Sequence, residues 1–101
     1  MTGYVLSADA ERDLDHIWDF IAEDNLDMAE RWIEKLFDAF DSLARNPGLG
    51  HKREDLTPHP VSFWPVGSYL IIYRASRRPI EIVAVTQGSR DIPAFLRWRE
   101  P

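Results

Sequence analysis

The apolar residues of this chain change their spacing halfway along, and this change constrains the fold more than any other feature. In residues 10–43 apolar side chains recur every three or four positions, which is the period of a helix with one buried face. In residues 61–86 they fill short runs rich in β-branched and aromatic residues, which is typical of strands. At 101 residues, the chain therefore joins a helical half to a sheet half in a single domain, 1–101.

The first half predicts two helices. Ser7 is a favourable N-cap behind a short apolar strand, Tyr4–Leu6, and Asn25 is a second N-cap close behind the first helix. Because the turn between the helices is very short, they form an antiparallel hairpin. Asn46-Pro47-Gly48 ends the second helix.

The first helix has an apolar and a polar side. The apolar stripe consists of Ala10, Leu14, Ile17, Trp18, Ile21 and Ala22. The other side holds the charged and polar residues Arg12, Asp13, Asp15, His16, Asp19 and Glu23. We therefore expect the second group, Asp13 included, to face water.

The second half predicts three strands, at residues 61–66, 69–74 and 80–86. The two connections are too short for a crossover, so these strands form an antiparallel meander, to which the N-terminal strand adds a fourth. A short amphipathic tail, 92–99, follows the last strand. The predicted fold class is α+β: an antiparallel helical hairpin packed on a four-stranded, mostly antiparallel sheet, with a short C-terminal helical tail.

The central strands are apolar on both faces. Apolar residues occupy nearly every position of 69–73 and 80–85, and Glu81 is the one charged residue among them. One helical hairpin covers only one face of a sheet. Either the C-terminal tail and the loop 48–60 cover the other face, or a partner protein docks there.

Composition and charge exclude several classes of protein. The chain has no cysteine, which rules out a disulfide framework, a thiolate zinc site and a cysteine nucleophile and favours a cytoplasmic protein. It shows neither a membrane span nor a signal peptide. The net charge of −5 divides into −8 for residues 1–50 and +3 for residues 51–101. An acidic total argues against a general nucleic-acid binder.

Known catalytic and metal-binding motifs do not occur. The three histidines are not spaced as a helical metal pair, and no Gly-x-Ser-x-Gly is present, so we expect neither a metal nor a cofactor. The remaining candidates are arginines at strand ends and on the tail, which bind carboxylate or phosphate groups. Arg90 either pairs with Asp91 to anchor the tail or serves a binding role.

Five stretches, taken together and in order, resemble the RelE/ParE superfamily of bacterial toxins, and within it the ParE branch. They are Leu6–Leu14, Ile17–Ala22, Asn46–Gly50, Phe63–Arg74 and Gly88–Ile92. Members of the ParE branch typically carry histidine before the glycine of the last stretch, where this chain has Gln87. The resemblance implies the same helical hairpin on an antiparallel sheet.

The resemblance also implies a function and partners. ParE-like toxins inhibit DNA gyrase by protein contact and without enzymatic chemistry, and a ParD-like antitoxin neutralises them in a hetero-oligomer. DNA is then contacted only through the antitoxin complex. Antitoxins of this kind bring acidic tails, which suit the basic second half of this chain.

Two alternatives remain. RelE-like relatives cleave mRNA on the ribosome with basic residues and a proton-transferring side chain, but here Leu70 aligns with the strand arginine, Phe95 and Leu96 lie near the catalytic tyrosine, and only Arg90 matches. Such an enzyme would clamp phosphate with Arg74 and Arg90. The third hypothesis is a relic that only forms a repressor complex with antitoxin and DNA.

The predicted sites are therefore protein contacts, because aromatic and arginine side chains dominate interface energetics. For antitoxin binding we select Trp18, Phe63, Trp64, Tyr69 and Arg74. For contact with the target or the antitoxin we select Arg90 and Arg97.

Overall fold

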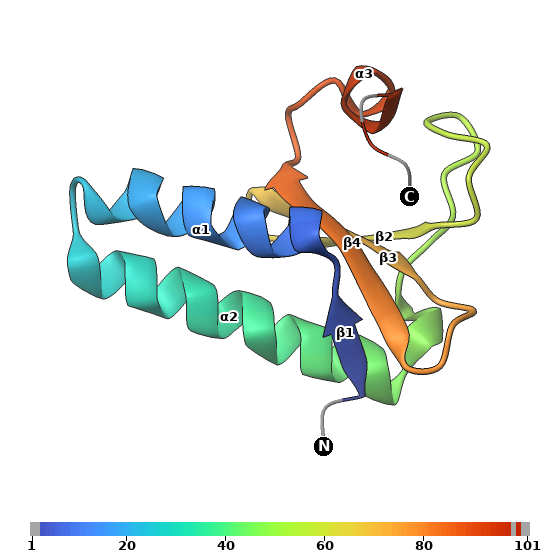
Figure 1. Cartoon of the computed structure of the whole chain (residues 1–101), viewed down its shortest axis with the longest axis horizontal. Coiled ribbons are helices and arrows are strands. Elements are labelled where there is room, and N and C mark those ends of the chain that lie inside the picture. The colour runs from blue at the N-terminus through green and yellow to red at the C-terminus, as the bar shows by residue number, and fades with distance from the viewer. Residues whose placement is uncertain (1–2, 98, 100–101) are drawn as a thin grey trace.

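A computed structural model describes residues 3–97 and 99 of the protein (Figure 1). Helices α1 (Ala8–Ala22) and α2 (Leu26–Arg45) lie side by side and antiparallel. The Ser7 and Asn25 side chains accept hydrogen bonds from helix N–H groups at 3.0 Å, so both predicted caps are confirmed. None of the helices in the described part of the chain has the length and apolar character needed to cross a membrane.

The sheet has four strands in the order β1-β4-β3-β2. They are β1 (Tyr4–Leu6), β2 (Ser62–Val66), β3 (Tyr69–Arg74) and β4 (Ile80–Gln87). The pairs β2–β3 and β3–β4 are antiparallel, whereas β1 runs parallel to β4. The short helix α3 (Ile92–Arg97) follows. The predicted α+β class with a mostly antiparallel sheet is confirmed.

One face of the sheet packs against the α1–α2 hairpin. We call this core the first-face cluster; Leu36 and Phe40 of α2 and Tyr73 of β3 are fully buried in it. The tight turn between β2 and β3 uses Gly67 at a φ of +58°, a conformation that suits glycine. A Cβ on Gly67 would meet the Trp32 ring of α2 at 2.5 Å, so this turn also closes against the hairpin.

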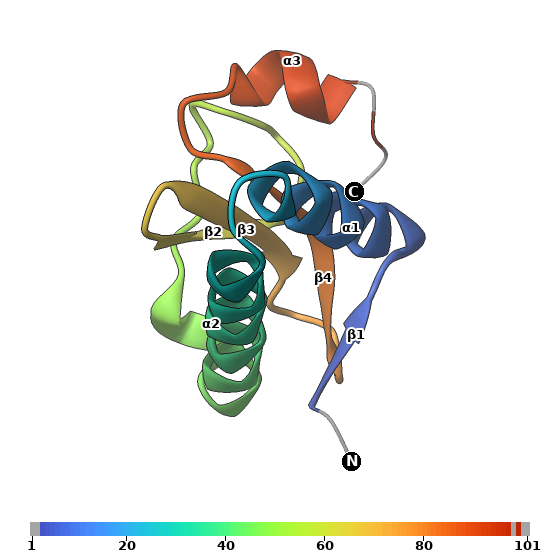
Figure 2. The same ribbon diagram turned by 90° about the vertical axis from the view of Figure 1, so that its left-hand side faces the viewer.

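The other face is covered by the chain itself. α3 lies away from α2, at the opposite end of the view in Figure 2. The second-face cluster consists of Val61, Phe63, Ile72, Val83, Ala84, Ile92 and Leu96, with Leu56, Leu70 and Phe95 packed against it. The tail and the loop before β2 therefore cover this face, and the alternative that a partner protein docks on it is wrong.

A bulge in β4 breaks the alternation of its side chains. Ile72 of β3 faces Ala84, whereas the next residue, Tyr73, faces Ile82, so Val83 is an extra residue without a partner in β3. Val83 and Ala84 consequently both pack in the second-face cluster.

Candidate protein-interaction site

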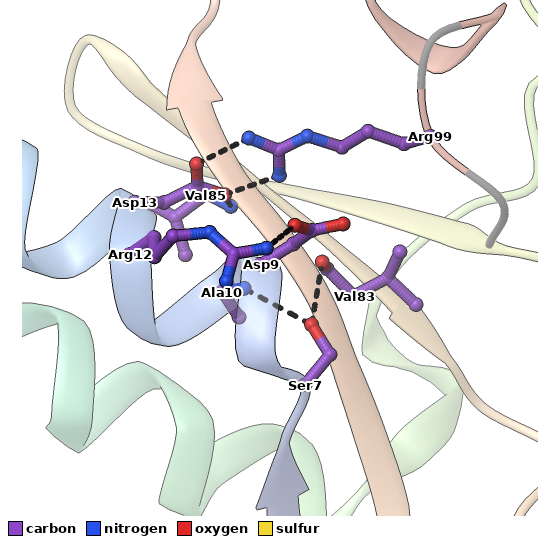
Figure 3. Close-up of polar contacts among 8 residues, drawn as sticks. All are labelled: Ser7, Asp9, Ala10, Arg12, Asp13, Val83, Val85 and Arg99. Carbon is purple, nitrogen blue, oxygen red and sulfur yellow. Dashed lines mark hydrogen bonds and ion pairs between the residues drawn. The ribbon is translucent and has the colours of Figure 1, made fainter.

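The N-cap residue Ser7 and Asp13 of α1 continue the hydrogen bonding of the β4 edge where β1 stops. Ser7 Oγ donates a hydrogen bond to the Val83 carbonyl at 2.9 Å. The Asp13 carboxylate accepts one from the Val85 N–H at 3.0 Å (Figure 3). Buried backbone groups need such partners, so these two side chains position the start of α1 against β4.

The same carboxylate binds an arginine from the end of the chain. Arg99 donates to both Asp13 oxygens, from Nη1 at 2.7 Å and Nη2 at 2.6 Å (Figure 3). The Asp13 side chain is 8% exposed and that of Arg99 19%. Hydrogen bonding to Asp13, with the nearby negative charge, raises the pKa of the Arg99 guanidinium. The expectation that Asp13 faces water is therefore wrong.

A sequence signal for the burial of Asp13 existed. It lies three residues after Ala10 and four before Ile17, which places it on the buried face of α1. A lone carboxylate at such a position requires a cationic or N–H partner. The partner itself is 86 residues away in the sequence, so helical periodicity does not identify it.

α3 begins at a side-chain cap and holds two guanidinium groups over one ring. Asp91 Oδ1 accepts a hydrogen bond from the Ala94 N–H at 3.2 Å. The guanidinium carbons of Arg90 and Arg99 lie 5.1 and 4.3 Å from the centroid of Phe95. Asp91 thus caps α3, and no ion pair between Arg90 and Asp91 is present in the part of the chain that the structure describes.

A hollow of about 340 Å³ separates α1 from α3, and we call it the α1–α3 groove. Its lining comes from α1, from the ends of β3 and β4 and from the tail: Asp13, His16, Ile17, Phe20, Tyr69, Val85, Thr86, Gln87, Arg90, Phe95 and Arg99. Polar and apolar groups both reach it, as is usual where proteins bind ligands or peptides. Sequence reasoning selected two of these residues, Tyr69 and Arg90, and missed Phe20 and the Asp13–Arg99 pair.

The four aromatic residues predicted to bind antitoxin lie in different places. Phe63 is 4% exposed within the second-face cluster, and Tyr69 is 7% exposed, with its ring 5.2 Å from that of Trp32. Trp64 is half-buried against the first-face cluster. Trp18 lines a second hollow, of about 370 Å³, between α1, α2 and β1, which we call the α1–α2 groove. Antitoxin contact by these residues stays a prediction.

The three predicted arginines are also dispersed. Arg74 Nε donates to Glu81 Oε1 at 2.8 Å, beside Arg77, at the end of the sheet where β3 finishes and β4 begins. Arg90 follows the opposite end of β4. Arg97 is exposed on α3. Arg74 and Arg90 therefore do not form the phosphate clamp considered for a nuclease, although their contact with partners stays a prediction.

Two positions that align with catalytic residues of RelE-like toxins carry no catalytic group, although His16 and Tyr69, whose side chains can transfer protons, line the groove. Leu70 packs against the second-face cluster and Phe95 lies beneath two guanidinium groups, and neither side chain transfers a proton. Across residues 3–97 and 99, no three His, Asp or Glu side chains gather closely enough to hold a metal ion.

Comparison with known proteins gives concordant matches. A family model described as the ParE toxin of type II toxin-antitoxin system, parDE, matches residues 4–92. Toxin ParE1 of Mycobacterium tuberculosis is 30% identical over 91 residues, which cover 88% of this chain and 92% of that protein. Toxin ParE1 of Caulobacter vibrioides is 30% identical over 97 residues, or 95% and 99% of the two chains.

A solved structure also matches. The "Chromosomal ParDE TA system from P. aeruginosa" superposes with a TM-score of 0.70 over 86% of this chain and 96% of that one, at 18% sequence identity. This likeness shows that the two chains share a fold.

Proposed function

Because this chain belongs to the ParE toxin family of type II toxin-antitoxin systems, we propose that it inhibits DNA gyrase by protein contact. A ParD-type antitoxin holds it inactive in a hetero-oligomer. Both partners act in the cytoplasm, which is where we place the toxin. The resemblance to the ParE branch is thus confirmed at the level of the family, and the target and the antitoxin are the proposal.

The observation that carries the proposal is the surroundings of Arg90. An mRNA-cleaving toxin requires several cations on the phosphate and a group that transfers a proton. Around Arg90 stand Phe95 and the Asp13–Arg99 pair, in which the charges cancel, and His16 and Tyr69 are the groups in the same groove that can transfer a proton. A single uncompensated cation beside an aromatic ring supports binding and gives little support to cleavage.

Purified protein tests the target directly. We expect a micromolar excess of the chain to stop DNA supercoiling by gyrase and to accumulate cleaved DNA, and we expect added ParD-type antitoxin to restore supercoiling. Gyrase that supercoils and cleaves as before would contradict the target and leave the family assignment in place.

A ribosome-dependent endoribonuclease remains the second candidate, because the resemblance aligns Arg90 with an arginine of RelE-like toxins. Pulse-labelling of bacteria that express the chain alone separates the two. Early loss of thymidine incorporation supports gyrase inhibition, and early loss of amino-acid incorporation supports mRNA cleavage. If mRNA cleavage is supported, primer extension on translated mRNA should find cut sites that Arg90→Ala abolishes. If neither thymidine nor amino-acid incorporation changes, the result supports the relic hypothesis.

A further inference from the structure

The lining of the α1–α3 groove combines an exposed aromatic side chain with an unpaired arginine. Phe20 of α1 is 66% exposed, the largest exposed fraction among the large apolar side chains of the described chain. Arg90 and Phe95, from the segment that leads into α3 and from α3 itself, line the same groove. A volume of about 340 Å³ admits one or two side chains of a partner and no folded domain.

Arg90 carries a positive charge that is available to a partner. Arg74, Arg77 and Arg99 each bind a carboxylate of this chain. Arg90 makes no ion pair with any described residue and is held over the Phe95 ring. An arginine already oriented by a ring loses little conformational freedom when it binds a carboxylate.

The Asp13–Arg99 pair shapes the groove, and its two charges already neutralise each other within the chain. Both Asp13 oxygens are occupied by Arg99, and Arg99 also lies over Phe95. The pair therefore connects α1, β4 and the tail, the three segments that contribute to the lining of the groove.

We propose that this groove binds a segment of the antitoxin that presents a carboxylate to Arg90 and an apolar side chain to Phe20. The proposal rests on the function proposed above, for which it names a binding site. Complementary charge favours the antitoxin, since the unpaired Arg90 and the exposed Arg97 suit the acidic tail that the resemblance to this family implies for its antitoxins.

Calorimetric titration of the chain with its co-expressed, separated ParD-type antitoxin tests the proposal. Arg90→Glu reverses the charge in the groove, and we expect it to weaken binding by about tenfold or more. Phe20→Ala, at an exposed position that contributes little to folding, is expected to weaken binding by about tenfold, as truncation of an aromatic anchor does.

The matched control is Arg78→Glu. Arg78 is an exposed arginine whose hydrogen bonds go to backbone carbonyls of the β3–β4 turn, at the opposite end of the sheet. Affinity within threefold of the unchanged protein is expected for this variant. Circular dichroism of all three variants confirms that they are folded.

Three results would overturn the proposal. If Arg90→Glu and Phe20→Ala bind antitoxin as tightly as the control does, the groove is not the site, and the function proposed above stands. If both keep antitoxin binding and lose inhibition of gyrase, the groove belongs to the target. If the unchanged chain binds no ParD-type antitoxin, the proposed function fails together with this site.

Discussion

The two faces of the sheet are covered by different means. The first face is covered by 35 helical residues of α1 and α2, with Leu36, Phe40 and Leu43 fully buried. The second is covered by a loop and by the six residues of α3, held by Ile92, Leu96 and the Asp13–Arg99 pair. A large apolar core carries the stability of the first face, whereas a few anchors hold the second, so the second face is expected to open first.

The largest effect is expected on the first face. Phe40→Ala removes a fully buried ring from the C-terminal half of α2, and we expect a loss of about 3–5 kcal/mol of unfolding free energy. Urea denaturation followed by fluorescence measures it. Phe20→Ala, at an exposed site on the neighbouring helix, is the control. An equal loss of unfolding free energy in both variants would contradict the conclusion that the buried core carries the stability of the first face.

A smaller and more local effect is expected on the second face. Leu96→Ala removes an apolar side chain from the contact between α3 and the sheet. We expect the unfolding free energy to fall by about 2–3 kcal/mol, near the low end for leucine because a short helix can relax. Hydrogen exchange of the amides of α3 should accelerate more than that of α2. Equal acceleration in both helices would mean that the two covers unfold together.

Asp13→Asn tests the polar anchor. The amide keeps an acceptor for the Val85 N–H but no longer neutralises Arg99. We expect a loss of about 2 kcal/mol, below the cost of a trapped charge, because Arg99 is partly exposed and can turn to water. Asp9→Asn removes an exposed carboxylate that pairs with Arg12 on the same helix and is the matched control, with little change in thermal stability.

Tyr73 is the corresponding polar anchor of the first face. Its hydroxyl donates to the Pro47 carbonyl at 2.7 Å and accepts from the Gly50 N–H at 2.9 Å, which ties the turn η1 (Pro47–Leu49) to β3. Tyr73→Phe is expected to cost about 1 kcal/mol at neutral pH. Chemical denaturation at pH 7 measures this loss, and a loss above that of Asp13→Asn would reverse the ranking of the two anchors.

The dependence of stability on alkaline pH gives a second test of the Tyr73 hydroxyl. Burial raises the pKa of Tyr73 above its ordinary 10.0, as it does for Tyr4 and Tyr69. The unfolded chain therefore ionises first, so the stabilisation is complete below about pH 10 and is lost as the pH rises through the folded pKa. Stability measured against pH should fall above pH 10 and fall less steeply in Tyr73→Phe.

Local features were predictable from the sequence and long-range ones were not. The caps at Ser7 and Asn25 and the turn at Gly67 depend on neighbouring residues, and they follow from simple rules. The parallel pairing of β1 with β4 and the extra residue Val83 depend on contacts between distant segments. Burial on both faces of the central strands was predictable, and only the structure distinguishes the chain's own tail from a partner as the cover.

The site was predictable in part for the same reason. Arg90 stands out as a basic residue at a strand end, and the fold places it in the α1–α3 groove. Phe20 follows Asp19 and precedes Ile21, outside the regular apolar stripe of the first helix, and nothing in the sequence signals that it shares a groove with a residue seventy positions later. Phe63 and Tyr69 are large aromatic residues that the fold buries, and size alone does not separate an interface anchor from a core residue.

The order in which the chain is synthesised gives the Asp13–Arg99 pair a further meaning. The α1–α2 hairpin makes mostly local contacts and can form early, but Asp13 meets its partner only after 86 further residues have left the ribosome. Until then the second face of the sheet lacks Ile92 and Leu96, and it exposes an apolar surface to chaperones and proteases. Formation of the Asp13–Arg99 ion pair is therefore a late step of folding, in which the nascent chain completes the cover of the second face.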